Sequence, residues 1–137
     1  MQHPITAGLR EQMIKWRHDL HAHPELGGQE ERTARFIAGL LEELGLEVHR
    51  GVGGTGVVGV LSRGDGDRGL GLRADMDALA ITEENTFDYR SLHTGCMHAC
   101  GHDGHMAMLL GAARYLTEQG QFNGRVHFIF QPAEEPG

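Results

Sequence analysis

The sequence predicts an α/β domain, because helix-like and strand-like segments alternate along the chain, each with its own hydrophobic periodicity. The chain has 137 residues, which corresponds to one domain. Hydrophobic residues make up 39% of it and charged residues 23%, a composition typical of a folded globular domain rather than a disordered segment. Glycine occurs 21 times, so we expect many tight turns between the elements.

Two amphipathic helices are predicted first. One covers residues 7–21, where apolar side chains recur at helical spacing, namely Leu9, Met13, Trp16 and Leu20. The other covers residues 29–44, and its apolar face comprises Phe36, Ile37, Leu40, Leu41 and Leu44. Gly45 followed by Leu46 is typical of a helix end at which glycine adopts the left-handed conformation.

Short strands are predicted next, over residues 46–50, 56–61 and 69–73. Residues 62–68 are rich in glycine and aspartate, which suit a turn, so we predict an antiparallel hairpin between the second and third of these strands. The glycine-rich residues 51–56 lead into a strand and include no lysine. They are therefore predicted to form a turn and not a phosphate-binding loop.

The remaining chain is predicted to contain a loop, a helix and a strand. Residues 81–99 are polar and are typical of a loop. A third helix is expected from near Gly104 to near Gly120, with one apolar face made of Met106, Leu109, Ala113 and Leu116. A turn at Asn123 and Gly124 then precedes a strand over residues 125–130, on which Val126, Phe128 and Phe130 share a face.

Charge and hydropathy exclude several classes of function. The formal net charge is −7, and a surface of that sign repels phosphate backbones, so we expect no nucleic-acid partner. No apolar run approaches the ~18 residues of a membrane span, and charged residues interrupt the segment where a secretory signal would lie. Cys96 and Cys100 are too few for a disulfide framework and lie among histidines, which favours reduced thiols. We therefore expect a cytoplasmic protein without a membrane partner.

The densest chemical signal is the segment His98–His105, which holds Cys100 among three histidines. Thiolate and imidazole are preferred ligands of zinc, cobalt and nickel. In an extended segment, residues two apart point the same way, so Cys100 and His102 are predicted to share one ion. Two alternatives are a solvent-exposed histidine loop and a structural zinc site that uses Cys96 as well. The second leaves the acidic groups described next without a role.

Two acidic groups follow predicted strands. Asp75 and Asp77 come after residues 69–73, and Glu134 and Glu135 come after the last strand. Sites in α/β sheets usually form beyond strand ends, so these groups and the cysteine–histidine segment are expected to meet at one edge of the sheet. There, Asp77 can ligate a cation or orient a ligating histidine. Adjacent glutamates face different directions, so one can bind a metal while its neighbour acts as a base.

Four blocks of the sequence together resemble the N-terminal part of the M20 metallopeptidase family. They are His21–Leu26 with Glu30 and Thr33, Leu72–Leu79, Met97–His105 and Gln131–Glu135. The likeness is to the amidohydrolase branch, which includes hippurate hydrolases, N-acyl-amino-acid amidohydrolases, N-acetyldiaminopimelate deacetylases and auxin-conjugate hydrolases. It implies a three-layer α/β/α zinc-peptidase-like catalytic domain, of which residues 1–137 form the N-terminal portion.

The resemblance also implies residue roles. The implied metal ligands are Cys100, His102 and Glu135. Glu134 corresponds to the general base that activates a metal-bound water, and Asp77 to an aspartate that supports the metal site from behind. The implied cofactors are two divalent ions per complete active site, zinc, manganese, cobalt or nickel. The implied reaction is hydrolysis of the amide bond of an N-acyl amino acid, such as a hippurate-like or N-acetyl conjugate.

In this family, two further histidine ligands and a lid or dimerisation domain follow the glutamate pair. Residues 1–137 include none of these features. We therefore expect residues 1–137 to be part of a longer chain and to be inactive alone. A homodimer is one option for the full-length protein. The alternative is a non-catalytic metal- or peptide-binding module derived from this fold. Benzoyl, acetyl and indole-acetyl substrates all remain compatible with these residues.

Overall fold

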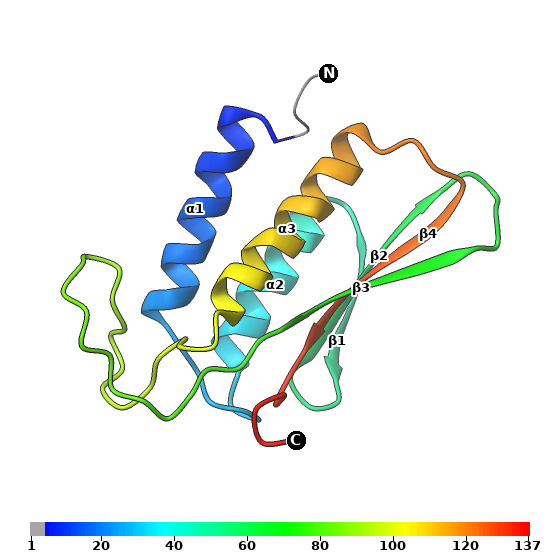
Figure 1. The fold of residues 1–137 in the computed structure, drawn as a ribbon. Coiled ribbons are helices and arrows are strands. Elements are labelled where there is room, and N and C mark those ends of the chain that lie inside the picture. The colour runs from blue at the N-terminus through cyan, green and yellow to red at the C-terminus, as the bar shows by residue number, and fades with distance from the viewer. Residues whose placement is uncertain (1–4) are drawn as a thin grey trace.

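The computed structural model describes residues 5–137, which form three helices and one four-stranded sheet (Figure 1). The elements are α1 (Ala7–Ala22), α2 (Glu31–Glu43), β1 (Glu47–Val52), β2 (Gly56–Arg63), β3 (Gly69–Asp75), α3 (His102–Gln119) and β4 (Gly124–Gln131). The helices lie on one face of the sheet (Figure 1). The predicted α/β class is confirmed, and the helices and sheet are two adjacent layers of the expected arrangement. Within the described residues, no helix combines the length and apolar character needed to cross a membrane.

The start of α2 is set by a carboxyl group from the preceding loop. The two side-chain oxygens of Glu25 accept hydrogen bonds from the backbone N–H groups of Arg32, at 3.0 Å, and Thr33, at 2.7 Å. These are amide groups that a helix leaves unpaired in its first turn. The helix therefore begins at Glu31 and not at Gln29. At its other end, Gly45 has a φ of 82°, which confirms the predicted left-handed glycine.

The sheet has the strand order β1-β2-β4-β3. β1 and β2 pair antiparallel, and the glycine-rich residues between them form the predicted turn. β4 pairs antiparallel with β2 and parallel with β3. The predicted hairpin between residues 56–61 and 69–73 is therefore wrong, because β4 lies between these strands.

β4 lies between β2 and β3 because its apolar face is buried. The turn residues on either side of the strand do not indicate this burial. Val126, Phe128 and Phe130 are at most 6% exposed and face the helices, which favours the centre of the sheet over an edge. The connection from β3 to the parallel β4 then requires a crossover, and α3 supplies it.

One cluster of buried apolar side chains joins the helices to the sheet. Its fully buried members include Leu20, Ile37, Leu41, Met106, Leu110 and Phe128. Burial of a side chain of this size contributes about 1.5–3 kcal/mol relative to exposure. The cluster fixes α3 against the sheet, so the start of α3 has a defined position relative to the ends of β3 and β4.

A long connection over residues 76–101 links β3 to α3 and is anchored to α1 through His21. This histidine is 3% exposed. Its Nδ1 lies 2.8 Å from Oδ2 of Asp103, and its Nε2 lies 2.9 Å from Oε2 of Glu83. Leu79 and Met97 exchange backbone hydrogen bonds of 2.9 and 3.0 Å. Leu79 and Met97 thus bring two parts of the connection together, and His21 links the connection to α1 and α3.

We expect the anchor at Glu83 to weaken in acid. Burial of its carboxyl group favours the neutral form, but hydrogen bonds from Asn85, His21 and the N–H of Ser91 outweigh burial and hold its pKa below the ordinary value. A carboxyl group with a lowered pKa stabilises the fold above its unfolded-state pKa, and this contribution is lost as pH falls through the folded-state pKa. Glu83→Gln should therefore lower the free energy of unfolding by about 1–3 kcal/mol at pH 7 and by much less at pH 3. Urea denaturation at both pH values measures this, and equal losses would contradict it.

Candidate metal centre

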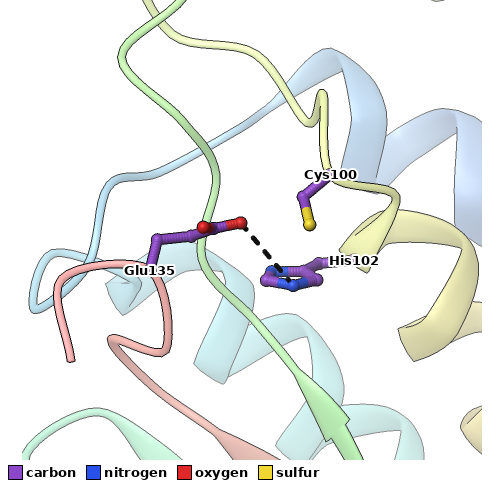
Figure 2. Close-up of side chains that lie close together, drawn as sticks. All are labelled: Cys100, His102 and Glu135. Carbon is purple, nitrogen blue, oxygen red and sulfur yellow. Dashed lines mark ion pairs between the residues drawn. The ribbon is translucent and has the colours of Figure 1, made fainter.

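The predicted site residues come from three segments that meet at one edge of the sheet. Asp77 follows β3, Glu134 and Glu135 follow β4, and Cys100 and His102 lie at the start of α3. The parallel pairing of β3 and β4 brings their carboxyl ends to the same edge. Ligand atoms of Cys100, His102 and Glu135 all lie within 4.8 Å of one another (Figure 2).

Cys100 and His102 converge by a route that differs from the prediction. The segment is not extended, because the intervening Gly101 is left-handed with a φ of 97°. His102 is the first residue of α3, so the helix begins before the predicted Gly104. A residue with a Cβ is strained at this φ. Glycine at position 101 thus turns the chain into the helix while both side chains face the same point.

The ring of His102 is oriented by a backbone contact. Its Nδ1 lies 2.7 Å from the carbonyl oxygen of Asp77, and the residue is 3% exposed. A carbonyl oxygen only accepts, so Nδ1 donates the hydrogen, and Nε2 of the neutral ring keeps its lone pair. That nitrogen lies 3.6 Å from Oε2 of Glu134 and 3.8 Å from Oε1 of Glu135. These distances are too long for hydrogen bonds and leave room for a cation.

Asp77 contacts two of the predicted ligands from behind the centre. It is fully buried, and its Oδ2 accepts a hydrogen bond of 2.9 Å from the backbone N–H of Glu135. Its Oδ1 is buried without a hydrogen-bond partner and lies 3.5 Å from Nδ1 of His102. An unpartnered buried carboxylate oxygen costs free energy unless positive charge is near. This oxygen therefore fits a centre that holds a cation.

The electrostatics around Cys100 also fit a cation. A hydrogen bond with Glu135, slight desolvation of this exposed side chain, and the negative charges of Glu135, Glu134 and Asp77 all raise the pKa of the Cys100 thiol above its ordinary value. A divalent ion reverses this shift, because it stabilises the thiolate and offsets the carboxylates. Sulfur, imidazole nitrogen and carboxylate oxygen together suit zinc, cobalt or nickel, and the oxygen donors also suit manganese.

A second group with suitable ligand spacing consists of Asp75, His102 and Glu134. Oδ1 of Asp75 already accepts two hydrogen bonds from the guanidinium of Arg73, at 2.9 and 2.7 Å. Because this ion pair neutralises Asp75, the group with Cys100 is the stronger candidate. The two groups share His102 and therefore describe one centre.

The alternative structural zinc site has no counterpart within residues 5–137. Cys96 is buried, whereas Cys100 is exposed, and no group with metal-ligand spacing in this part of the chain includes Cys96. It lines a small cavity with Pro24 and His93 instead. The two cysteines thus lie in different surroundings.

Two histidines of the same segment lie outside the ligand groups. His98 is 4% exposed, and neither ring nitrogen has a hydrogen-bond partner. Burial lowers its pKa to about 4, so the ring is neutral at pH 7. His105 is exposed on α3. The histidine-rich pattern alone did not separate these two residues from His102.

One buried acidic residue near the centre, Glu30, was not predicted from the sequence as a site residue. Glu30 is fully buried, and it hydrogen-bonds to the backbone N–H of Ala133, directly before the glutamate pair. The only signal available was its membership of the block that begins at His21. Its partner lies 103 positions away, and no local pattern reveals such a contact.

Comparison with known proteins supports the relationship that the motifs indicated. Residues 71–137 match the profile of peptidase family M20/M25/M40. The chain is 50% identical over 132 residues to a hippurate hydrolase of Campylobacter jejuni, covering 96% of this chain and 34% of that protein. It is 48% identical over 129 residues to an N-acyl-L-amino acid amidohydrolase of Geobacillus stearothermophilus, covering 93% and 35%. The chain therefore spans about a third of the length of these relatives.

A solved structure extends the likeness to three dimensions. The YXEP protein of Bacillus subtilis, described as a dinuclear metal-binding peptidase of the M20 family, matches with a TM-score of 0.87 and 42% sequence identity. The match covers 93% of this chain and 36% of that one. The fold described here is thus the fold of the corresponding part of that peptidase.

Proposed function

We propose that this chain, which is similar to proteins of peptidase family M20, forms the N-terminal portion of the catalytic domain of a metal-dependent amidohydrolase. The proposed substrates are N-acyl amino acids, either hippurate-like or N-acetyl conjugates. The observation that carries the proposal is the convergence of Cys100, His102 and Glu135 within 4.8 Å. We further propose that the complete protein acts in the cytoplasm, where a thiol ligand stays reduced. We also propose that the complete protein is a homodimer.

The complete site is proposed to hold two divalent ions, zinc, manganese, cobalt or nickel, with Cys100, His102 and Glu135 as this chain's ligands. When bound, such ions polarise the acyl carbonyl and make a water molecule more acidic. Two further histidine ligands are proposed to lie downstream of Gly137. The contribution of this chain to the chemistry then depends on two carboxyl groups, those of Glu134 and Asp77.

Glu134 is the proposed general base. Its side chain is 40% exposed, and its Oε2 lies 3.6 Å from Nε2 of His102, so it borders the centre and remains accessible to substrate. It takes a proton from the attacking water and passes that proton to the nitrogen of the leaving amine. Its neighbour Glu135 is held by the bond from its N–H to Asp77, which suits a ligand. The adjacent residues thus divide the two roles.

Asp77 is proposed to support both ligands and not to bind substrate. Through its carbonyl oxygen it fixes which nitrogen of His102 carries hydrogen, and through Oδ2 it holds the backbone of Glu135. Groups of this kind orient metal ligands and raise their basicity. Its complete burial is consistent with this supporting role.

The proposal is tested on the native gene product. Its intact mass in the source cells first establishes how far the chain extends. We then expect the purified protein to hydrolyse N-benzoyl or N-acetyl amino acids, to lose this activity on treatment with a chelator, and to regain it with manganese, zinc, cobalt or nickel. A protein that binds metal but hydrolyses none of these amides would instead support the non-catalytic binding module.

A further inference from the structure

Glu30 lies fully buried directly before α2 and reaches across to the turn that carries the glutamate pair. Its Oε1 accepts a hydrogen bond of 2.7 Å from the backbone N–H of Ala133. Its Oε2 accepts a hydrogen bond of 2.7 Å from the hydroxyl of Thr55, in the turn between β1 and β2. One carboxyl group therefore links α2 to two turns at the same edge of the sheet.

The turn at Ala133 has an unusual backbone. With a φ of 49°, Ala133 is the only residue other than glycine with a positive φ among residues 5–137. The left-handed conformation brings the Cβ of an L-residue too close to the following carbonyl oxygen. Such a conformation persists only when the surrounding structure imposes it. Glu30 binds the N–H of this same residue, immediately before Glu134.

A purely local role for Glu30 does not account for its contacts. Its side chain makes no capping hydrogen bond to α2. Glu25 performs that task through the N–H groups of Arg32 and Thr33. Because burial of a carboxyl group is costly without partners, the distant bonds to Ala133 and Thr55 are what accommodate Glu30.

The loop before Glu30 packs against the same turn. A Cβ built on Gly27 would lie 2.8 Å from Cγ of Pro136 and 3.2 Å from Cα of Ala133. Only glycine allows so close an approach at this position. Residues 27–30 therefore hold the turn over residues 133–136 both by contact and by a buried hydrogen bond.

We propose that Glu30 is a positioning residue of this centre. It holds Ala133 in the left-handed conformation and thereby fixes where the carboxyl groups of Glu134 and Glu135 lie relative to His102. This inference rests on the proposed function, because it concerns the same metal centre. Glu30 itself does not touch the ligand atoms and acts only through the turn.

The test is a cobalt titration of the native gene product, freed of its own metal, and it follows the near-ultraviolet band of thiolate bound to cobalt. We expect Glu30→Ala to weaken cobalt binding by about 10–100-fold, the usual effect of losing a group that orients ligands. Glu30→Gln should stay within about threefold of the native protein, because its amide oxygen still accepts from Ala133 and its NH₂ can donate to Thr55. When hydrolysis of N-acyl amino acids is assayed at saturating metal, Glu30→Ala should lower kcat by a larger factor than it raises KM.

A matched control separates positioning from general loss of stability. Glu25→Ala removes hydrogen bonds at the start of α2 but none to the turn, so it should lower the Tm with cobalt affinity unchanged. If Glu30→Ala does not fold, Glu30→Asp replaces it, since its carboxyl group is one methylene short of Ala133 and should weaken binding in the same direction.

Three results overturn the inference. Cobalt affinity unchanged in folded Glu30→Ala, or in Glu30→Asp where it replaces that variant, overturns the positioning role alone and leaves the proposed function standing. An equal loss of affinity in Glu25→Ala overturns it too, because the effect is then one of overall stability. Failure of the native protein to bind cobalt overturns the proposed metal centre, and the positioning role with it.

Discussion

Replacing Glu134 by glutamine in the native gene product is expected to lower kcat by about 10²–10⁴-fold, the usual contribution of a general base. Glutamine has the same shape but cannot take a proton from water at neutral pH. The ligand group of Cys100, His102 and Glu135 is untouched by this change. The metal content, measured by elemental analysis of the purified variant, should therefore equal that of the native protein.

The neighbouring position supplies the contrast for this experiment. Glu135→Gln removes a ligand charge and should lower metal content together with turnover, because Glu135 belongs to the group that contains Cys100. Full turnover in Glu134→Gln would refute its role as base. Loss of metal from Glu134→Gln with metal retained in Glu135→Gln would instead favour the second ligand group, which includes Asp75.

The sequence predicted the helices of this fold better than its sheet. The helices follow from spacing within one segment, and Gly45 marks the end of α2 as expected. The pairing of strands depends on contacts that are distant along the chain. The turn residues between β2 and β3 favour a hairpin, but β4, whose apolar face is buried, lies between these two strands. Local turn chemistry carries no information about this competition.

The candidate site, like the fold, was only partly predictable from the sequence. Cys100, His102 and Glu135 carry recognisable chemistry and follow strand ends or precede a helix, so their meeting could be inferred from topology. The left-handed Gly101 could not, because an extended segment would also have placed Cys100 and His102 together. The role of Glu30 was hidden for a different reason. A buried glutamate before a helix resembles a cap, and only the three-dimensional contact with Ala133 distinguishes it from one.

The second large effect is expected at Cys100. Cys100→Ala in the native gene product should abolish the near-ultraviolet band of thiolate bound to cobalt and weaken cobalt binding by about 100-fold or more, because a thiolate is among the strongest ligands for such ions. Cys96→Ala is the matched control, since Cys96 is buried and lies outside the ligand groups of residues 5–137. That variant should keep both the band and the affinity. A band that persists in Cys100→Ala would refute the site, whereas loss of the band in both variants would favour the structural zinc site that uses Cys96 together with Cys100.

The pH dependence of cobalt binding separates a thiolate ligand from a nearby thiol. Hydrogen bonding to Glu135, slight desolvation and the surrounding carboxylates raise the pKa of Cys100, so at neutral pH cobalt must displace the thiol proton. Below that pKa, each unit of lower pH makes the thiolate about tenfold scarcer, so the apparent affinity should fall by about tenfold per unit between pH 8.5 and pH 7. Cys100→Ala removes this proton from the binding equilibrium and should bind weakly with a much flatter pH dependence. A native protein whose cobalt affinity is the same at both pH values would show that the sulfur of Cys100 is not a ligand, however close it lies to His102.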